Sequence, residues 1–190
     1  MILLTDFGDL AVLLPLATVM LLWLLAQRQR RGLLGWAGAV AFCCGVTAVL
    51  KIYFSVCAVD PALQSPSGHT SFSMLVYGGI ALVVAAESTG WQRLMALAGG
   101  VGLVAGIAVS RIVLGAHTPL EVILGMVIGA IAVAVFAWGY LSHRPAGLAL
   151  RPLLVTLVVL AVLLHGQELH AEEMLHAIGR YLHLGGMVCP

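Results

Sequence analysis

Long apolar runs recur along the whole chain, and they constrain its fold more than any other feature does. Their approximate ranges are 8–27, 33–54, 69–86, 91–109, 119–141 and 152–165. A helix rises about 1.5 Å per residue, so a run of roughly 20 residues crosses a hydrocarbon core of about 30 Å. Only 9% of the residues are charged, against roughly 25% in soluble domains. We predict an all-α fold: one polytopic membrane helical bundle of about six transmembrane helices, forming a single domain over residues 1–190.

Turn-forming residues separate the apolar runs. Residues 55–68 contain Asp-Pro, Ser-Pro and Ser-Gly pairs, which mark a loop. Residues 111–118 are predicted to form a second loop, and Pro119 begins the fifth helix, since proline is favoured at the first helical position. From Gln167 onward, Glu, His and Leu recur at helical spacing, which favours a short C-terminal interfacial helix over a seventh span.

Glycines and cysteines within the helices are predicted to pack closely. Gly102-x-x-x-Gly106 and Gly125-x-x-x-Gly129 allow close helix crossings. The pair Cys43-Cys44 is interpreted as small apolar residues inside a helix. Cys57 and Cys189 fall on the same side of a six-span protein, but whether they pair is left open because spacing does not determine connectivity.

Arginines are concentrated on one side of the predicted bundle. In a six-span topology with both termini outside, that side holds Arg28, Arg30, Arg31, Arg93, Arg144 and Arg151. The positive-inside rule makes this side cytoplasmic, and we expect an integral protein of the bacterial inner (plasma) membrane. No basic residue precedes the first run, so we interpret it as a retained helix rather than a cleaved signal peptide. A net charge of +1 with no basic run beyond residues 28–31 argues against a nucleic-acid partner.

Two polar islands fall on the opposite, extracytoplasmic side. One is Pro66-Ser67-Gly68-His69, which leads into the third helix, and the other runs from Ser110 to Glu121. Ionisable groups at membrane depth cost several kcal/mol each, so they usually serve a function. We predict that the two islands meet and form a site.

The groups of the two islands suit a phosphate-like anion. Helix N-termini bind anions, and Gly68 lets the backbone approach a ligand. Ser67 can add a hydroxyl donor, and a simple N-cap role is compatible with that task. Lys51 adds a point charge and Arg111 adds a planar fork that matches phosphate oxygens.

These residues resemble the three signature motifs of the type-2 phosphatidate phosphatase superfamily. The motifs correspond to Lys51, to Pro66-Ser67-Gly68-His69 and to Ser110-Arg111-x5-His117-x3-Glu121. The resemblance implies a metal-independent phosphatase without a cofactor, which acts on lipid phosphates or diphosphates through a phosphohistidine intermediate.

The resemblance also implies a role for each residue. His117 would be the nucleophile, Glu121 would orient its imidazole, and His69 would be the general acid that protonates the leaving oxygen. The implied phosphate-binding groups, which stabilise charge on the phosphoryl oxygens, are Lys51, Ser67, Gly68 and Arg111.

Two positions depart from the family pattern. The first motif normally ends in Arg-Pro, but Ala58-Val59 stand there, so one phosphate-binding guanidinium is missing. The third motif normally ends in Asp, and Glu121 is one methylene longer. Thr118-x-x-Glu121 also has the form of a helix capping box, and we expect that one carboxylate cannot fully satisfy both roles.

Several functions therefore stay open. The leading one is a phosphatase of the extracytoplasmic face that acts on a glycerolipid phosphate or an isoprenoid diphosphate such as undecaprenyl diphosphate. A lipid phosphotransferase and a non-catalytic lipid-phosphate-binding protein are the alternatives, and the presence of both His69 and His117 favours catalysis. Glu173-x-x-His176 has metal-ligand spacing but no partner motif, so we predict no metal site. The sequence specifies neither the lipid nor the oligomeric state.

Overall fold

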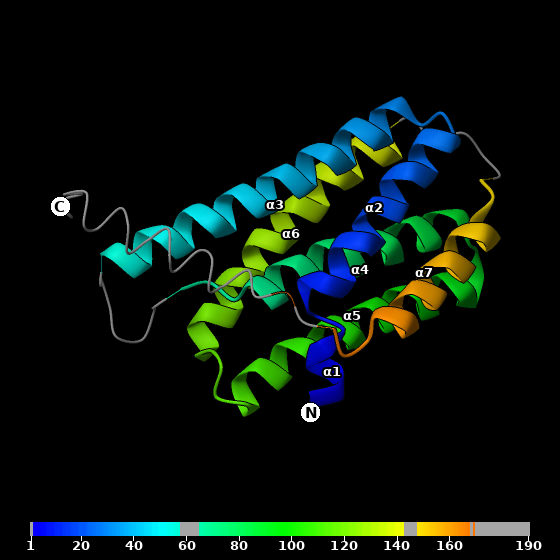
Figure 1. The fold of residues 1–190 in the computed structure, drawn as a ribbon. Coiled ribbons are helices and arrows are strands. Elements are labelled where there is room, and N and C mark those ends of the chain that lie inside the picture. Colours follow the sequence, from blue (N-terminus) through cyan, green and yellow to red (C-terminus); the bar gives the residue numbers. More distant parts are fainter. Residues whose placement is uncertain (1, 58–64, 143–147, 168, 170–190) are drawn as a thin grey trace.

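The computed structural model describes residues 2–57, 65–142, 148–167 and 169, in which every regular element is a helix (Figure 1). The helices are α1 (Ile2–Asp6), α2 (Leu10–Ala26), α3 (Arg30–Val56), α4 (Gly68–Glu87), α5 (Gly90–Val113), α6 (Pro119–Leu141) and α7 (Leu150–Leu164). The predicted all-α fold is confirmed.

Within the described ranges, five helical segments are long and apolar enough to cross a membrane. They are Leu3–Ala26, Arg30–Phe54, Gly68–Glu87, Gly90–Val113 and Pro119–Leu141. Helix α7 is also apolar but has only 15 residues, so at about 1.5 Å per residue it is shorter than a full span. The chain is a polytopic integral membrane protein.

The structure departs from the predicted helix ends at two places. A short additional helix, α1, precedes α2. Helix α5 continues to Val113, so Arg111 lies in its last turn and not in a loop as predicted. The reason is that no helix-stopping residue occurs before Gly115. The interfacial helix predicted beyond Gln167 lies outside the described residues.

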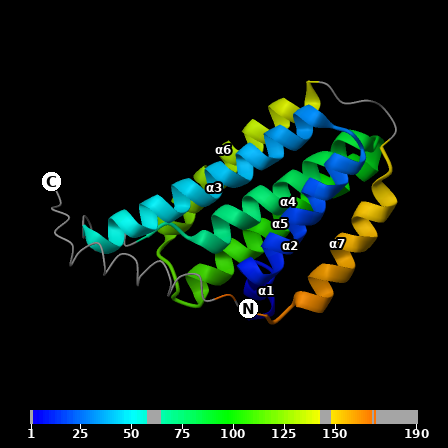
Figure 2. The same ribbon diagram turned by 45° about the horizontal axis from the view of Figure 1, so that its top comes forward.

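Helix α4 lies in the middle of the bundle. It packs against α5 and α6 and also contacts α2 and α3, while α3 runs along α6 and α7 packs on α2 (Figures 1 and 2). Trp36 of α3 illustrates the core: it is fully buried, and its indole N–H donates to the Ala17 carbonyl at 2.9 Å. Its ring lies 4.9 Å from that of Phe136, edge to face. The central place of α4 brings its first residues beside the last turns of α3 and the first turns of α6.

Only one of the two glycine motifs makes a close helix crossing. A Cβ atom added to Gly125 would lie 2.6 Å from the Ser67 carbonyl oxygen, so α6 approaches the α4 backbone where no side chain fits. An atom added to Gly102 would meet nothing within 4 Å, and one added to Gly106 would meet only Leu4, at 3.7 Å. The close crossing predicted from Gly102-x-x-x-Gly106 is wrong, because neither glycine faces a neighbouring backbone.

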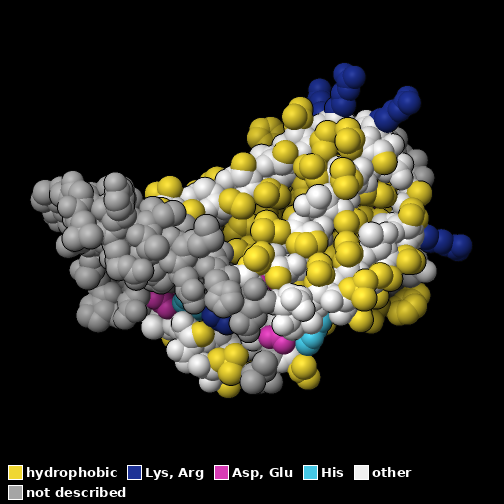
Figure 3. Space-filling model, viewed as in Figure 1, with side chains coloured by type: hydrophobic (Ala, Val, Ile, Leu, Met, Phe, Trp, Pro, Cys, Tyr) yellow, Lys and Arg dark blue, Asp and Glu magenta, His cyan; other side chains and the backbone are white. Residues whose placement is uncertain are grey.

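The outer surface of the bundle is apolar along its length. Figure 3 shows hydrophobic side chains across the middle of the molecule, most of the visible Lys and Arg side chains toward the end where α2 leads into α3, and Asp, Glu and His toward the other end. Exposed apolar side chains include Leu22, Val101 and Trp138. A soluble monomer rarely exposes a continuous apolar surface of this kind, whereas the hydrocarbon core of a bilayer accommodates it.

The cysteines divide into two kinds. Cys43 is buried and Cys44 half-buried in α3, both as free thiols. Cys57 is disulfide-bonded, and its pairing with Cys189 stays open. Cys189 lies outside the described residues.

Candidate active site

Helix α4 begins at the Pro-Ser-Gly-His motif. Ser67 is its N-cap, and the Ser67 Oγ accepts from the Thr70 N–H at 3.4 Å and from the Thr70 hydroxyl at 3.0 Å. Its side chain is fully buried. Gly68 and His69 follow as the first two residues of the helix. The hydroxyl oxygen of Ser67 thus serves the cap, and donation of its proton to a phosphate stays a prediction.

Lys51 of α3 lies beside this helix start. A Cβ atom added to Gly68 would lie 3.4 Å from the Lys51 Cε and 4.0 Å from its Nζ. The ammonium group is therefore close to the N-terminus of α4, which carries a partial positive charge of its own. Two positive groups at one point favour an anion between them, and the missing side chain of Gly68 leaves the helix backbone accessible.

The connection from α5 to α6 carries the third motif. Helix α5 ends in a Schellman motif: Gly115 has a φ of 66°, the Ala116 N–H donates to the Arg111 carbonyl at 3.0 Å, and the Gly115 N–H donates to the Ile112 carbonyl at 3.0 Å. The His117 N–H also donates to the Arg111 carbonyl, at 3.2 Å. The spacing between Arg111 and His117 is thus set by one turn that places the guanidinium in the last helical turn and the imidazole just after it.

The imidazole of His117 contacts the carboxylate of Glu121. His117 Nδ1 lies 2.9 Å from Glu121 Oε2, and the two side chains are 6% and 5% exposed. The same Oε2 accepts the Thr118 N–H at 3.0 Å, and Thr118 Oγ1 accepts the Glu121 N–H at 3.3 Å, which completes a capping box. The expectation that one carboxylate could not satisfy both positions is wrong as to the contacts, whereas the orienting role itself stays a prediction. The two groups it contacts belong to adjacent residues, so a single oxygen reaches both.

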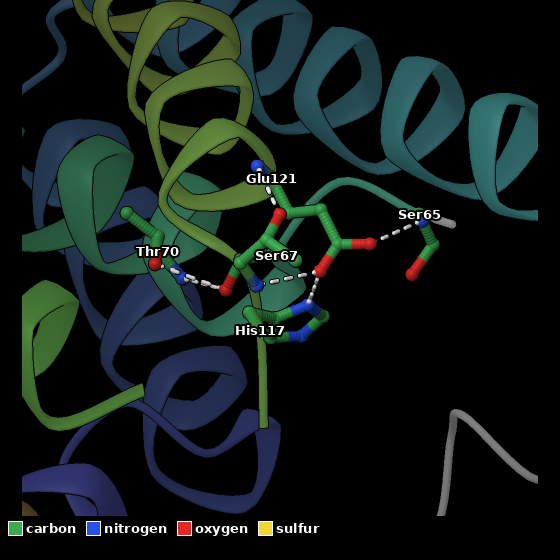
Figure 4. Close-up of polar contacts among 6 residues, drawn as sticks. Ser65, Ser67, Thr70, His117 and Glu121 are labelled. Atoms are coloured by element: carbon green, nitrogen blue, oxygen red, sulfur yellow. Dashed lines mark hydrogen bonds and ion pairs between the residues drawn. The ribbon is translucent and has the colours of Figure 1, made fainter. Parts of the chain in front are cut away.

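Glu121 also connects the third motif to the second (Figure 4). Its Oε1 accepts the Ser65 N–H at 2.8 Å, and its backbone carbonyl accepts the Ser67 N–H at 3.1 Å. The close approach of α6 at Gly125 makes these contacts possible. Two polar islands that are far apart in the sequence therefore meet at one end of the bundle.

Two residues near the N-terminus contact the site, and the sequence reasoning assigned no role to either. Asp9 Oδ2 lies 3.6 Å from His69 Nε2, and Arg111 Nη1 donates to the Thr5 hydroxyl oxygen at 3.2 Å. One available signal was that Asp9 is a charged residue at the start of the first long apolar run, on the predicted side of His69. No local pattern pointed to Thr5.

All seven predicted site residues lie at the same end of the bundle. Lys51 is near the end of α3, Ser67, Gly68 and His69 are at the start of α4, Arg111 is at the end of α5, and His117 and Glu121 flank the start of α6. The set combines two imidazoles with cationic and amide donors, which suits phosphoryl transfer. The role of each residue stays a prediction.

Some predicted features fall outside the described part of the chain. These are positions 58 and 59, where the first motif departs from the family, and positions 173 and 176, with metal-ligand spacing. Among the described residues, no group of three or more His, Cys, Asp or Glu side chains could hold a metal ion.

Comparison with known proteins identifies one family and one relative. A family model described as the PAP2 superfamily matches residues 32–146. A protein described as an uncharacterized 22.5 kDa protein in the cps region of Klebsiella pneumoniae is 30% identical over 146 residues, covering 70% of this chain and 66% of the relative. The chain thus spans slightly less than two thirds of that relative's length. No solved structure matches the chain.

Proposed function

Because the chain belongs to the PAP2 superfamily, a family of phosphatases, we propose that it is a membrane enzyme that hydrolyses a lipid phosphate or an isoprenoid diphosphate. The family supports a phosphatase in general terms. The membrane-spanning helices support a substrate that is itself held in the bilayer, because the site lies at one end of the apolar bundle.

The proposed reaction has two phosphoryl-transfer steps. His117 attacks phosphorus through Nε2, because its Nδ1 faces Glu121. A P–N bond forms while the P–O bond to the lipid breaks, and His69 gives a proton to the leaving oxygen. Water then attacks phosphorus and gives a proton to His69; a P–O bond forms while the P–N bond breaks, and the electron pair returns to His117 Nε2. Free phosphate leaves and both histidines regain their starting states.

Positive groups around the phosphoryl oxygens stabilise the charge of the transition state. The groups are the ammonium of Lys51, the guanidinium of Arg111 and the amide end of α4. They occupy the place that a divalent metal takes in metal-dependent phosphatases. The proposed reaction therefore needs no metal ion.

The contact between His117 and Glu121 is the observation that carries the proposal. A nucleophilic imidazole must keep one nitrogen deprotonated and must hold the positive charge that develops on attack. A buried carboxylate at 2.9 Å from Nδ1 favours the tautomer with the proton on Nδ1 and stabilises the imidazolium. A protein that only bound phosphate would not need an imidazole nitrogen kept free for attack.

The arginine distribution supports an extracytoplasmic site in a bacterial plasma membrane. Arg28, Arg30, Arg31 and Arg93 lie at the ends of α2 to α5 remote from the histidines, and the positive-inside rule places such an end in the cytoplasm. The site would then face the periplasm or the exterior.

Phosphate release from a panel of lipid phosphates tests the proposal. Purified protein in detergent with a chelator should release phosphate from at least one glycerolipid phosphate or isoprenyl diphosphate. His117→Ala should abolish both release and covalent labelling by radiolabelled phosphate. Activity that is lost with chelator and restored by magnesium would contradict the metal-free mechanism. Transfer of the phosphoryl group to a second lipid would identify a phosphotransferase, and binding without turnover a binding protein.

A further inference from the structure

We propose that Asp9 is a positioning residue for His69, and that two N-terminal residues, Thr5 and Asp9, thereby belong to the catalytic site. The inference rests on the proposed function, because it takes His69 as the general acid. It adds a carboxylate partner for the acid, comparable to the one that Glu121 provides for the nucleophile.

The two oxygens of Asp9 have separate tasks. Oδ1 accepts the Ala11 N–H at 2.8 Å, as the N-cap of α2, and the Leu169 N–H at 3.0 Å. Oδ2 lies 3.6 Å from His69 Nε2. Asp9 is 7% exposed and the His69 side chain 18% exposed, so the charge of the carboxylate acts on the imidazole with little screening by solvent. The backbone donors fix the orientation of the carboxylate, so that its second oxygen faces the imidazole.

The segment that carries Asp9 packs against α4 and α5. A Cβ atom added to Gly8 would lie 2.8 Å from Ile107 Cγ2, so the backbone here touches α5. The hydroxyl of Tyr77 on α4 donates to the Phe7 carbonyl at 2.7 Å. Asp9 therefore has a defined place relative to the start of α4.

A second contact from the same segment reaches another site residue. Thr5 accepts a hydrogen bond from Arg111 Nη1 at 3.2 Å. The segment thus touches both the proposed acid and a phosphate-binding cation. The family match begins at residue 32, so both contacts come from a part of the chain that the family pattern does not include.

The charges around His69 explain why a carboxylate is useful here. Lys51 of α3 lies against Gly68, and Arg111 lies at the end of α5, whereas Glu121 of α6 is engaged by His117. Nearby cations disfavour a protonated imidazole and a nearby carboxylate favours it. Asp9 offsets the cations and keeps on His69 the proton that the leaving oxygen requires.

The test compares wild type and Asp9→Asn on two lipid phosphates that share a chain but differ in leaving group, an alkyl phosphate and an aryl phosphate. Asparagine keeps the N-cap but removes the charge. General acids contribute about 100- to 10,000-fold, so we expect kcat/KM on the alkyl phosphate, which reports the first phosphoryl transfer, to fall about tenfold or more. The kcat/KM of the aryl phosphate should stay near the wild-type value, because a phenolate leaves without protonation.

Three further variants complete the test. Asp9→Ser also keeps the cap but is too short to reach the imidazole, so it should reproduce the pattern of Asp9→Asn. In a His69→Ala background, Asp9→Asn should cause no additional loss. Asp6→Asn is the matched control. Asp6 lies three residues before Asp9, and its carboxylate also faces a histidine, with 3.8 Å between Asp6 Oδ2 and His165 Nε2. Both substrates should be cleaved by this control at the wild-type rate.

Several results would overturn the inference alone. These are an unchanged kcat/KM on the alkyl phosphate, an equal loss of kcat/KM on both substrates, an additive loss in the His69→Ala background, or Asp9 variants that fail to fold while Asp6→Asn folds. If the wild-type protein releases no phosphate, or if His117→Ala keeps its activity, the proposed function is overturned and this inference with it.

Discussion

At the scale of single residues, Glu121 combines a structural and a proposed catalytic task. Its carboxylate accepts backbone N–H groups from Ser65 and Thr118 and contacts His117 Nδ1. Two backbone donors fix its orientation before any substrate binds, and such preorganised groups need not reorient during the reaction. We expect the extra methylene, relative to the aspartate of the family pattern, to be what lets one side chain reach the capping position and the imidazole together.

Glu121→Gln should reduce both activity and stability. The amide of glutamine has only one acceptor oxygen, so at least one of the N–H groups that now donate to the carboxylate would face an NH2 group. We expect this to lower the free energy of unfolding by about 1–3 kcal/mol. The amide also cannot stabilise an imidazolium, and we expect kcat to fall about 100-fold. Phosphate release and thermal unfolding in detergent measure the two effects.

Glu121→Asp is the informative comparison for this prediction. If the longer side chain is required here, aspartate should lose activity even though it restores the family residue. Reduced stability with full activity in Glu121→Gln would show that Glu121 is only a helix cap.

At the scale of elements, the crossing of α4 and α6 holds the two histidine motifs together. Gly125→Ala would place a methyl group 2.6 Å from the Ser67 carbonyl oxygen, and a backbone atom cannot move aside as a side chain can. We expect a loss of about 1–3 kcal/mol in stability and reduced phosphate release, because the start of α4 shifts away from His117.

Gly102→Ala is the matched control, since nothing lies within 4 Å of its added methyl group. It should keep wild-type activity and stability, and alanine favours the helix. Equal behaviour of the two glycine variants would contradict the close crossing.

The end of α5 gives a second test at this scale. Gly115 has a φ of 66°, a conformation that costs a β-branched residue roughly 1–2 kcal/mol. Gly115→Val should therefore displace His117 and lower kcat, whereas Gly115→Asn should be tolerated because asparagine adopts this conformation more readily. Phosphate release by the two variants measures the difference, and equal activity would show that the turn does not position His117.

At the scale of the whole molecule, the separation of charge predicts how the protein sits in the membrane. Single cysteines introduced at Ser65 and Arg93 should react with a membrane-impermeant maleimide from opposite sides, with Ser65 accessible from outside. The two positions lie at opposite ends of the bundle, Ser65 before the start of α4 and Arg93 in the first turn of α5. Labelling of both from the same face would overturn the proposed orientation.

The amino-acid sequence by itself determined the helices and most of the candidate site. The length of the apolar runs predicts the helices, because a bilayer requires every spanning backbone to satisfy its own hydrogen bonds. The proline at position 119 and the motif around His69 are local signals, which can be read from a few neighbouring residues. The predicted range of the fifth helix, 119–141, agrees with α6 (Pro119–Leu141). The sequence predicted Arg111 in the loop 111–118, but it lies in the last turn of α5, because the residue that ends this helix is Gly115.

Only the tertiary structure decided which groups meet. The contacts of Asp9 with His69 and of Thr5 with Arg111 join distant segments, and no periodicity in either segment encodes its partner. The two glycine motifs look alike in the sequence, yet Gly125 touches a backbone and Gly102 faces open space. The physical reason is that a helix pattern determines which residues share a face, while the element packed against that face is selected by the whole bundle.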